Sequence, residues 1–291
     1  MKLISFKHMT GPRPGVALND KIYLDIVAAD PELPKSWNLL FAHMDRVAEL
    51  VATWHEPGGV IDGVPLISSG KYPLLPPVIA PSKIIAVGLN YRDHAEEQKR
   101  RTPAQPLLFS KASTCLQAHE CPIRLDPDLT RVDAEAELAV VIGRVGRRIS
   151  RADAPDHIAG YMCFNDVTNR EAQSVDKQFF RGKSIDTGGP CGPWLVTPDE
   201  LPPLARGLAI EGRLNGEIVQ ESNTDRLIFP VDELIRFASQ HMTLLPGDII
   251  ATGTPSGVGV FREPPRFLRA GDVYTVSIEG LGTLVNPVVS A

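Results

Sequence analysis

Short apolar runs bounded by turn residues recur along the chain, and they predict a strand-rich protein. Ile4 and Phe6 lie two positions apart in the first run, so both side chains point to one face of a strand. The apolar runs 15–18 and 21–26 flank a polar pair, which predicts a small antiparallel hairpin. We predict further strands over 84–88, 135–142, 161–164, 207–214, 217–221, 248–252 and 273–288. The Asn215–Gly216 pair is the strongest hairpin signal in the chain.

The spacing of apolar residues changes to a helical period in two regions. One is the stretch from about 36 to 55, where Ser36 can cap the first turn. The other is the amphipathic stretch 231–241. Residues 92–101 form a polar stretch that also predicts a helix.

A proline-rich segment interrupts these elements at 72–81. Proline stiffens the chain and removes backbone donors, so the segment is typical of a linker or of a strap at a domain edge. We therefore expect a small strand-rich domain over 1–78 and a larger catalytic domain over 79–291, consistent with a length of 291 residues.

Composition excludes several classes of protein. The hydrophobic fraction is 43%, the charged fraction is 22% and the net charge is -5, as in a globular protein with a real core. Mild acidity without a cluster of Lys and Arg argues against a nucleic-acid partner, and no apolar stretch is long enough for a membrane span. The four cysteines form no metal-binding spacing. A cytoplasmic protein with reduced cysteines is the simplest expectation.

The most informative segment carries two glutamates at the start of a predicted strand. Glu135 and Glu137 are two apart, so they project to the same face. Asp166 follows the next predicted strand, where a loop can bring a third carboxylate to the first two. Three carboxylates favour a hard cation such as Mg²⁺, Mn²⁺ or Ca²⁺. The alternative is that both glutamates lie on the solvent face of an edge strand.

Three other segments carry candidate chemistry. His94 and Glu97 are three apart on a predicted helix, so the carboxylate can orient the imidazole as a base. Lys183 lies in a glycine-rich loop and can stabilise an oxyanion or enolate. A second glycine-rich loop, 249–259, can hold a carboxylate through backbone N–H groups. The alternative readings are a solvated helix and two mobile turns.

Taken together, five segments resemble the fumarylacetoacetate hydrolase superfamily over roughly residues 80 to 289. The matching segments are GLNYRDHAEE (88–97), DAEAELAVVIG (133–143), GYMCFNDVTNREAQ (160–173), FRGKSIDTGGPCGPW (180–194) and GDIIATGTPSGVG (247–259). Residues 1–78 look like the small domain that precedes the catalytic domain in many members. The sequence departs from the common pattern at Asn169, Glu171 and Gly188–Gly189, which affects the shape of the pocket and leaves the metal ligands intact.

The resemblance implies an α+β, strand-rich fold with a mixed β-sandwich or β-roll catalytic domain, and a homodimer. It implies that Glu135, Glu137 and Asp166 bind Mg²⁺ or Mn²⁺, with Ca²⁺ as a possible substitute in crystals. The catalytic residues that it implies are His94, Glu97 and Lys183. The substrate-binding residues that it implies are Arg170, Gln173 and Thr254.

The function expected from this resemblance is hydrolysis of a C–C bond in a small diketo or 2-oxo acid of the acylpyruvate type, through a metal-stabilised enolate. The same residues can serve decarboxylation of an oxaloacetate-like acid or isomerisation of a 2-hydroxydienoate. A non-catalytic metabolite-binding protein on the same fold is the alternative from another class.

Overall fold

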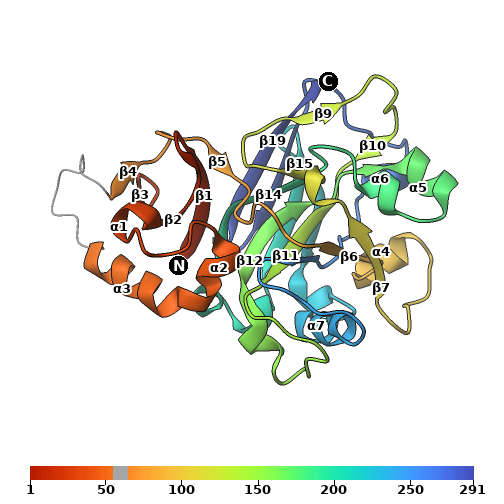
Figure 1. The fold of residues 1–291 in the computed structure, drawn as a ribbon. Coiled ribbons are helices and arrows are strands. Elements are labelled where there is room, and N and C mark those ends of the chain that lie inside the picture. The colour runs from red at the N-terminus through yellow and green to blue at the C-terminus, as the bar shows by residue number, and fades with distance from the viewer. Residues whose placement is uncertain (55–64) are drawn as a thin grey trace.

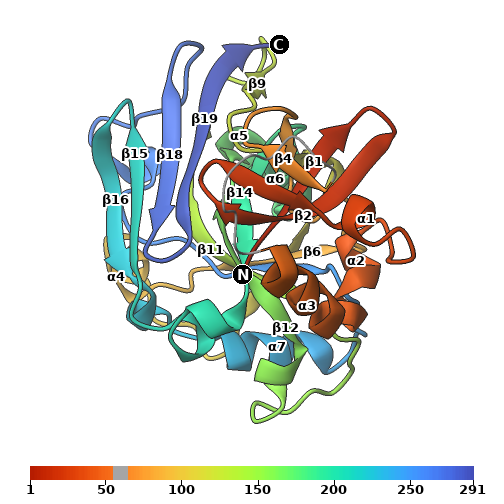
Figure 2. The same ribbon diagram turned by 90° about the vertical axis from the view of Figure 1, so that its left-hand side faces the viewer.

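The computed structural model describes residues 1–54 and 65–291 of the chain. Within these residues, 12 strands form one long mixed sheet and five strands form a second sheet that packs against it (Figure 1, Figure 2). The strands of the long sheet are β1 (Lys2–His8), β2 (Gly11–Asn19), β3 (Ile22–Asp25), β4 (Leu66–Ser68), β5 (Leu74–Leu75), β6 (Ile84–Gly88), β7 (Leu107–Lys111), β8 (Leu116–Gln117), β11 (Ala136–Ile142), β12 (Ile158–Asn165), β14 (Gly189–Val196) and β17 (Ile249–Ala251). Their order is β4-β3-β2-β1-β14-β12-β11-β17-β6-β7, with β5 beside β1 and β8 beside β14.

Four of the five strands of the second sheet come from the C-terminal part of the chain, and β9 comes from its middle. Its strands are β9 (Ile123–Leu125), β15 (Ala209–Leu214), β16 (Glu217–Asn223), β18 (Val273–Ile278) and β19 (Gly282–Ser290), in the order β16-β15-β18-β19-β9. A separate pair joins β10 (Val132–Asp133) to β13 (Thr168–Asn169). The predicted hairpin at 207–221 is confirmed. Asn215 and Gly216 both have positive φ, 54° and 85°, which matches the right-handed twist of the flanking strands.

Helices lie in the three regions where the sequence predicts them, although their ends differ, and three further helices form where none is predicted. One of these ends at Lys183, so the expectation that Lys183 lies in a loop is wrong. The helices are α1 (Ile26–Ala29), α2 (Trp37–Leu40), α3 (Met44–Trp54), α4 (Arg92–Glu97), α5 (Arg170–Asp176), α6 (Phe180–Lys183) and α7 (Val231–Ser239). The helix predicted from about 36 is divided by a 3-10 turn, and residue 55 lies outside the described residues. Ser36 precedes α2, but its hydroxyl makes no capping hydrogen bond. The helix predicted to reach residue 101 ends at Glu97, since Lys99 has a φ of 52° in the left-handed region.

The apolar run of β11 reflects burial on both faces of the long sheet. Leu138 and Val140 join the core between the two sheets, whereas Ala139 and Val141 join a second core on the opposite face. Such a strand needs apolar residues at consecutive positions rather than at alternate ones. The charged residues Glu135 and Glu137 therefore stand at the entrance of a strand that is otherwise apolar.

The N-terminal strands continue the long sheet instead of forming a sheet of their own. Strand β1 pairs antiparallel with β14, with Leu3 opposite Leu195. The Trp37 indole donates a hydrogen bond to the carbonyl of Ile4 at 2.7 Å, which fastens α2 to β1. In Figure 1 these red and orange elements form one side of the molecule. The division into domains 1–78 and 79–291 stays a prediction.

Candidate active site

Three carboxylates meet where two central strands lie side by side. Glu137 is the second residue of β11, Glu135 immediately precedes that strand, and Asp166 follows the end of β12. The strands are antiparallel with Ala136 opposite Asn165, so the start of one strand lies at the end of the other. One oxygen of each carboxylate lies within 4.8 Å of the others, and all three side chains are buried. The structure thus brings together the residues that the sequence suggested as metal ligands.

Lys183 neutralises part of this negative charge. Its Nζ donates to Oε2 of Glu135 at 2.6 Å and to Oδ2 of Asp166 at 2.7 Å. Burial alone would raise the pKa of Glu135, but Lys183 and Arg170 outweigh it and bring this pKa to about 2. Burial would likewise lower the pKa of Lys183, yet Asp166 and Glu135 raise it. Lys183 is therefore a permanent cation beside the carboxylates.

Glu137 is the least compensated of the three carboxylates. It accepts one hydrogen bond, from the backbone N–H of Gly253 at 2.9 Å, and among the described residues it forms no ion pair. Burial, and then repulsion from Asp166 and Glu135, raise its pKa well above the usual range. A buried carboxylate without a cation is costly. Three oxygen donors and this uncompensated charge fit a divalent cation such as Mg²⁺ or Mn²⁺.

A second buried lysine, which the sequence analysis missed, forms an ion pair with one carboxylate of the cluster. Lys111 ends β7, and its Nζ lies 2.7 Å from Oδ1 of Asp166. The same ammonium donates to the backbone carbonyls of Gly188, at 3.1 Å, and of Lys183. All three donors of Lys111 are thus used, and they join Asp166 to the segment that carries Lys183.

Arg170 binds the other side of the cluster. Its guanidinium donates to Oε1 of Glu135 at 2.6 Å and to Oδ1 of Asp133 at 2.6 Å. It also donates to Oε1 of Gln173, one turn further along α5, at 3.0 Å. The guanidinium therefore fixes the orientation of Glu135. Asp133 was not singled out from the sequence, although it lies two residues before Glu135.

The predicted pair on α4 is formed. His94 Nδ1 lies 2.8 Å from Oε2 of Glu97, and the backbone N–H of Gly257 donates to Oε1 of the same carboxylate at 2.8 Å. Gly257 has a φ of 99°, a conformation in which a side chain would be strained. The glycine-rich loop therefore holds two of the protein's own carboxylates, Glu97 here and Glu137 through Gly253.

Thr254 lies in the same loop and lines the cavity that contains the glutamates. Its hydroxyl donates to the carbonyl of Ala136 at 2.9 Å and accepts from the amide of Gln220 at 2.8 Å. These two bonds hold Thr254 beside the glutamates of β11.

These groups surround one cavity of about 410 Å³. All the residues predicted from the sequence line it except Glu97 and Asp166, which contact the lining residues His94 and Lys183. Gln98, Arg100 and Arg131 also line it, and the sequence analysis gave them no role. A cavity that combines hard ligands, a buried cation and a carboxylate–histidine pair is suited to proton transfer at an acidic substrate.

Comparison with known proteins agrees with this arrangement. Residues 83–289 match the family described as fumarylacetoacetate (FAA) hydrolase C-terminal, and this range includes every residue of the cavity named above. The chain belongs to this family. A mitochondrial oxaloacetate tautomerase, Fahd2a of Rattus norvegicus, is 41% identical over 99% of this chain and 92% of its own.

Solved structures of family members have the same fold over the whole chain. A putative HpcE protein from Mycobacterium smegmatis is 35% identical with a TM-score of 0.86, and the match covers 100% of both chains. The fumarylacetoacetate hydrolase of Exiguobacterium antarcticum is 36% identical with a TM-score of 0.83, again over 100% of both chains. The strand-rich α+β fold expected from the sequence is confirmed, and the relatives are enzymes of this family. In the described part of the chain, no helix is long and apolar enough to cross a membrane.

Proposed function

We propose that this protein is an enzyme that interconverts the keto and enol forms of oxaloacetate or a closely related 2-oxo dicarboxylic acid. The observation that carries the proposal is one cavity lined by an oriented histidine, a buried lysine and two clustered glutamates, with Asp166 in contact with the lysine. The rat relative, 41% identical over 99% of this chain, is named as an oxaloacetate tautomerase, which supports the choice of reaction.

The reaction needs one proton to leave C3 of the keto acid and one to reach the oxygen on C2. No water is consumed and no carbon–carbon bond breaks. His94 would take the C3 proton at Nε2, because its Nδ1–H is held by Glu97. Glu97 would stabilise the imidazolium that forms, and His94 would then give the same proton to the oxygen on C2, so that no proton is gained or lost overall. In the reverse direction His94 would take the enol proton and return it to C3.

Lys183 would stabilise the oxygen on C2 as negative charge grows there. Two of its three N–H donors are used by Glu135 and Asp166, so one is left for the substrate. Glu135, Glu137 and Asp166 would hold the divalent cation, which when bound supplies Lewis-acid polarisation of the 2-oxo group.

The cavity wall also suits a second carboxylate on the substrate. Arg170 and Lys183 are paired with carboxylates of the protein, whereas Arg100 and Arg131 form no ion pair among the described residues. The Arg131 guanidinium lies 5.5 Å from the centre of the Phe267 ring, which limits its movement. These two arginines support a dicarboxylic acid as the substrate class.

Hydrolysis of a C–C bond, the activity first expected from the sequence, becomes the second candidate. A cavity of about 410 Å³ is of the size that holds drug-sized ligands, so it leaves room for a longer acyl chain than that of oxaloacetate. Decarboxylation and 2-hydroxydienoate isomerisation use the same residues and remain further alternatives. A purely metabolite-binding role is disfavoured, because every proposed catalytic position carries a competent residue. The homodimer and the cytoplasmic location stay predictions.

The test is a substrate panel with purified protein in Mg²⁺ and then in EDTA. The panel contains enol-oxaloacetate, acetylpyruvate and fumarylpyruvate, followed by ultraviolet absorbance, with CO₂ and carboxylic acids measured as products. We expect metal-dependent loss of the enol with no CO₂ and no cleavage. Two acid products from a diketo acid would establish the hydrolase instead, and CO₂ from oxaloacetate would establish a decarboxylase. No turnover of any substrate with metal bound would overturn the proposal.

A further inference from the structure

The residue that follows α4 makes a direct contact with the proposed base. Gln98 lies four positions after His94, so the two side chains share one helix face. Its Nε2 lies 2.7 Å from Nε2 of the imidazole. Both residues line the cavity, and His94 is only 5% exposed. The contact is therefore made inside the site.

The hydrogen-bond pattern decides the direction of this contact. The carboxylate of Glu97 accepts from Nδ1–H of His94, so Nε2 of a neutral ring carries the lone pair. The amide of Gln98 then donates its N–H to that lone pair. This nitrogen is the one that would accept a proton from the substrate, and the amide stands where the reacting carbon has to approach.

The surroundings leave the ring little freedom to avoid this contact. Glu97 is held by the backbone N–H of Gly257 at 2.8 Å. The ring of Phe261 packs edge-on against the imidazole, with 5.7 Å between the ring centres. Because the imidazole is fixed by its neighbours, the flexible side chain of Gln98 is the part that can move away.

We propose that Gln98 is a positioning residue that occupies the proton-accepting nitrogen of His94 in the substrate-free enzyme and is displaced when substrate binds. The inference rests on the proposed role of His94 as the base, and it holds for any reaction in which His94 has that role. Glu97 sets the tautomer of the imidazole, and Gln98 satisfies its free nitrogen, so the enzyme loses this one hydrogen bond on binding substrate.

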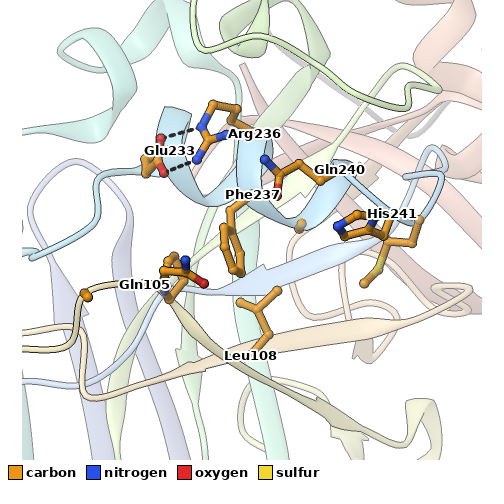
Figure 3. Close-up of a pocket in the computed structure, with 11 residues that line it drawn as sticks. Gln105, Leu108, Glu233, Arg236, Phe237, Gln240 and His241 are labelled. Atoms are coloured by element: carbon orange, nitrogen blue, oxygen red, sulfur yellow. Dashed lines mark hydrogen bonds and ion pairs between the residues drawn. The ribbon is translucent and has the colours of Figure 1, made fainter.

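A hydrogen bond present only in the free enzyme weakens substrate binding and leaves the chemical step unchanged. Gln98→Met keeps the length of the side chain and removes the donor. We expect its KM for the substrate to fall about 2- to 10-fold, the scale of one hydrogen bond, with kcat unchanged. Gln105→Met is the matched control, since Gln105 is exposed and lies in a different pocket (Figure 3), and it should change neither parameter.

A second measurement tests the contact without turnover. In substrate-free protein labelled with ¹⁵N-histidine, the Nε2 resonance of His94 should shift in Gln98→Met and stay in place in Gln105→Met. A fall in kcat with constant KM would overturn the proposal, because Gln98 would then act in the transition state. Unchanged kinetics or an unchanged resonance would also overturn it. If the wild-type enzyme turns over no substrate in the panel, the proposed function fails, while the resonance still tests the contact.

Discussion

Two pockets of this molecule differ both in size and in how their charges are balanced. The larger, about 600 Å³, lies between α7 and the segment that leads into β7 (Figure 3). Its charged residues Glu233 and Arg236 pair with each other through two hydrogen bonds, of 2.6 and 2.7 Å. The smaller, about 410 Å³, contains Glu137, a buried carboxylate for which the described residues provide no ion pair.

The difference shows that unbalanced charge identifies the site better than volume does. Glu233 and Arg236 are partly exposed on one helix, and each balances the charge of the other without a ligand. Burying several carboxylates together is unfavourable unless a bound cation repays the cost. For this reason we propose the smaller cavity as the site that binds the cation and the substrate.

The largest expected effect comes from removing the uncompensated carboxylate. Glu137→Gln should lower kcat/KM by about 10³-fold or more, because polarisation by a metal is worth several kcal/mol. Mg²⁺ binding, measured by calorimetry, should be lost as well. Glu49→Gln, at an exposed position on α3 outside the cavity, is the control and should retain both properties. Wild-type turnover in Glu137→Gln would show that the carboxylates do not form the metal site.

The sequence predicted the site best where the repeat of a single strand or helix places two side chains on the same face. The i, i+2 spacing of Glu135 and Glu137 and the i, i+3 spacing of His94 and Glu97 follow from strand and helix repeats. The contact of Gln98 with His94 also has a local spacing and was within reach of the same reasoning. The glycine-rich surroundings of Lys183 pointed to that residue, and the family resemblance supplied Arg170, Gln173 and Thr254.

Other features depend on pairing between distant segments, which no local pattern reveals. Lys111 meets Asp166, 55 positions away, only because β6 and β7 continue the sheet beyond β17. The pairing of β1 with β14 joins residues nearly 200 positions apart, so the proline-rich segment did not predict it. Arg131 is a candidate for binding the substrate only because it lines the folded cavity. The residues next to it in the sequence do not indicate that position.

The next largest effect is expected from removing Lys111, which pairs with Asp166 of the carboxylate cluster. Lys111→Met should lower Mg²⁺ affinity about 10- to 100-fold, because Lys111 orients Asp166 without touching the ion. Breaking a buried ion pair should also cost about 3–5 kcal/mol of folding stability. Lys83→Met removes a lysine that pairs with buried Asp248 away from the cavity, so it controls for lost stability. Equal Mg²⁺ affinity in the two folded variants would exclude a positioning role for Lys111.

A smaller effect on substrate binding is expected from removing Arg131, which lines the cavity. Arg131→Met should raise the KM for oxaloacetate about 10-fold, the scale of one charge-assisted hydrogen bond. The KM for acetylpyruvate, which has a methyl ketone in place of the distal carboxylate, should stay the same. Arg147→Met, at an exposed position outside the cavity, should affect neither substrate. An equal rise for both substrates would mean that Arg131 does not recognise the second carboxylate.

The smallest effect is expected in the larger pocket, and it tests the comparison most directly. Arg236→Met breaks the ion pair with Glu233, which lies one helical turn away at the surface. Partly exposed pairs of this kind contribute little because water and salt screen them, so the melting temperature should fall by about 2 °C at most. Kinetics on the whole substrate panel should match those of the wild type. A loss of activity comparable with that of Arg131→Met would mean that the larger pocket takes part in catalysis, and that charge balance is a poor guide to the active site of this protein.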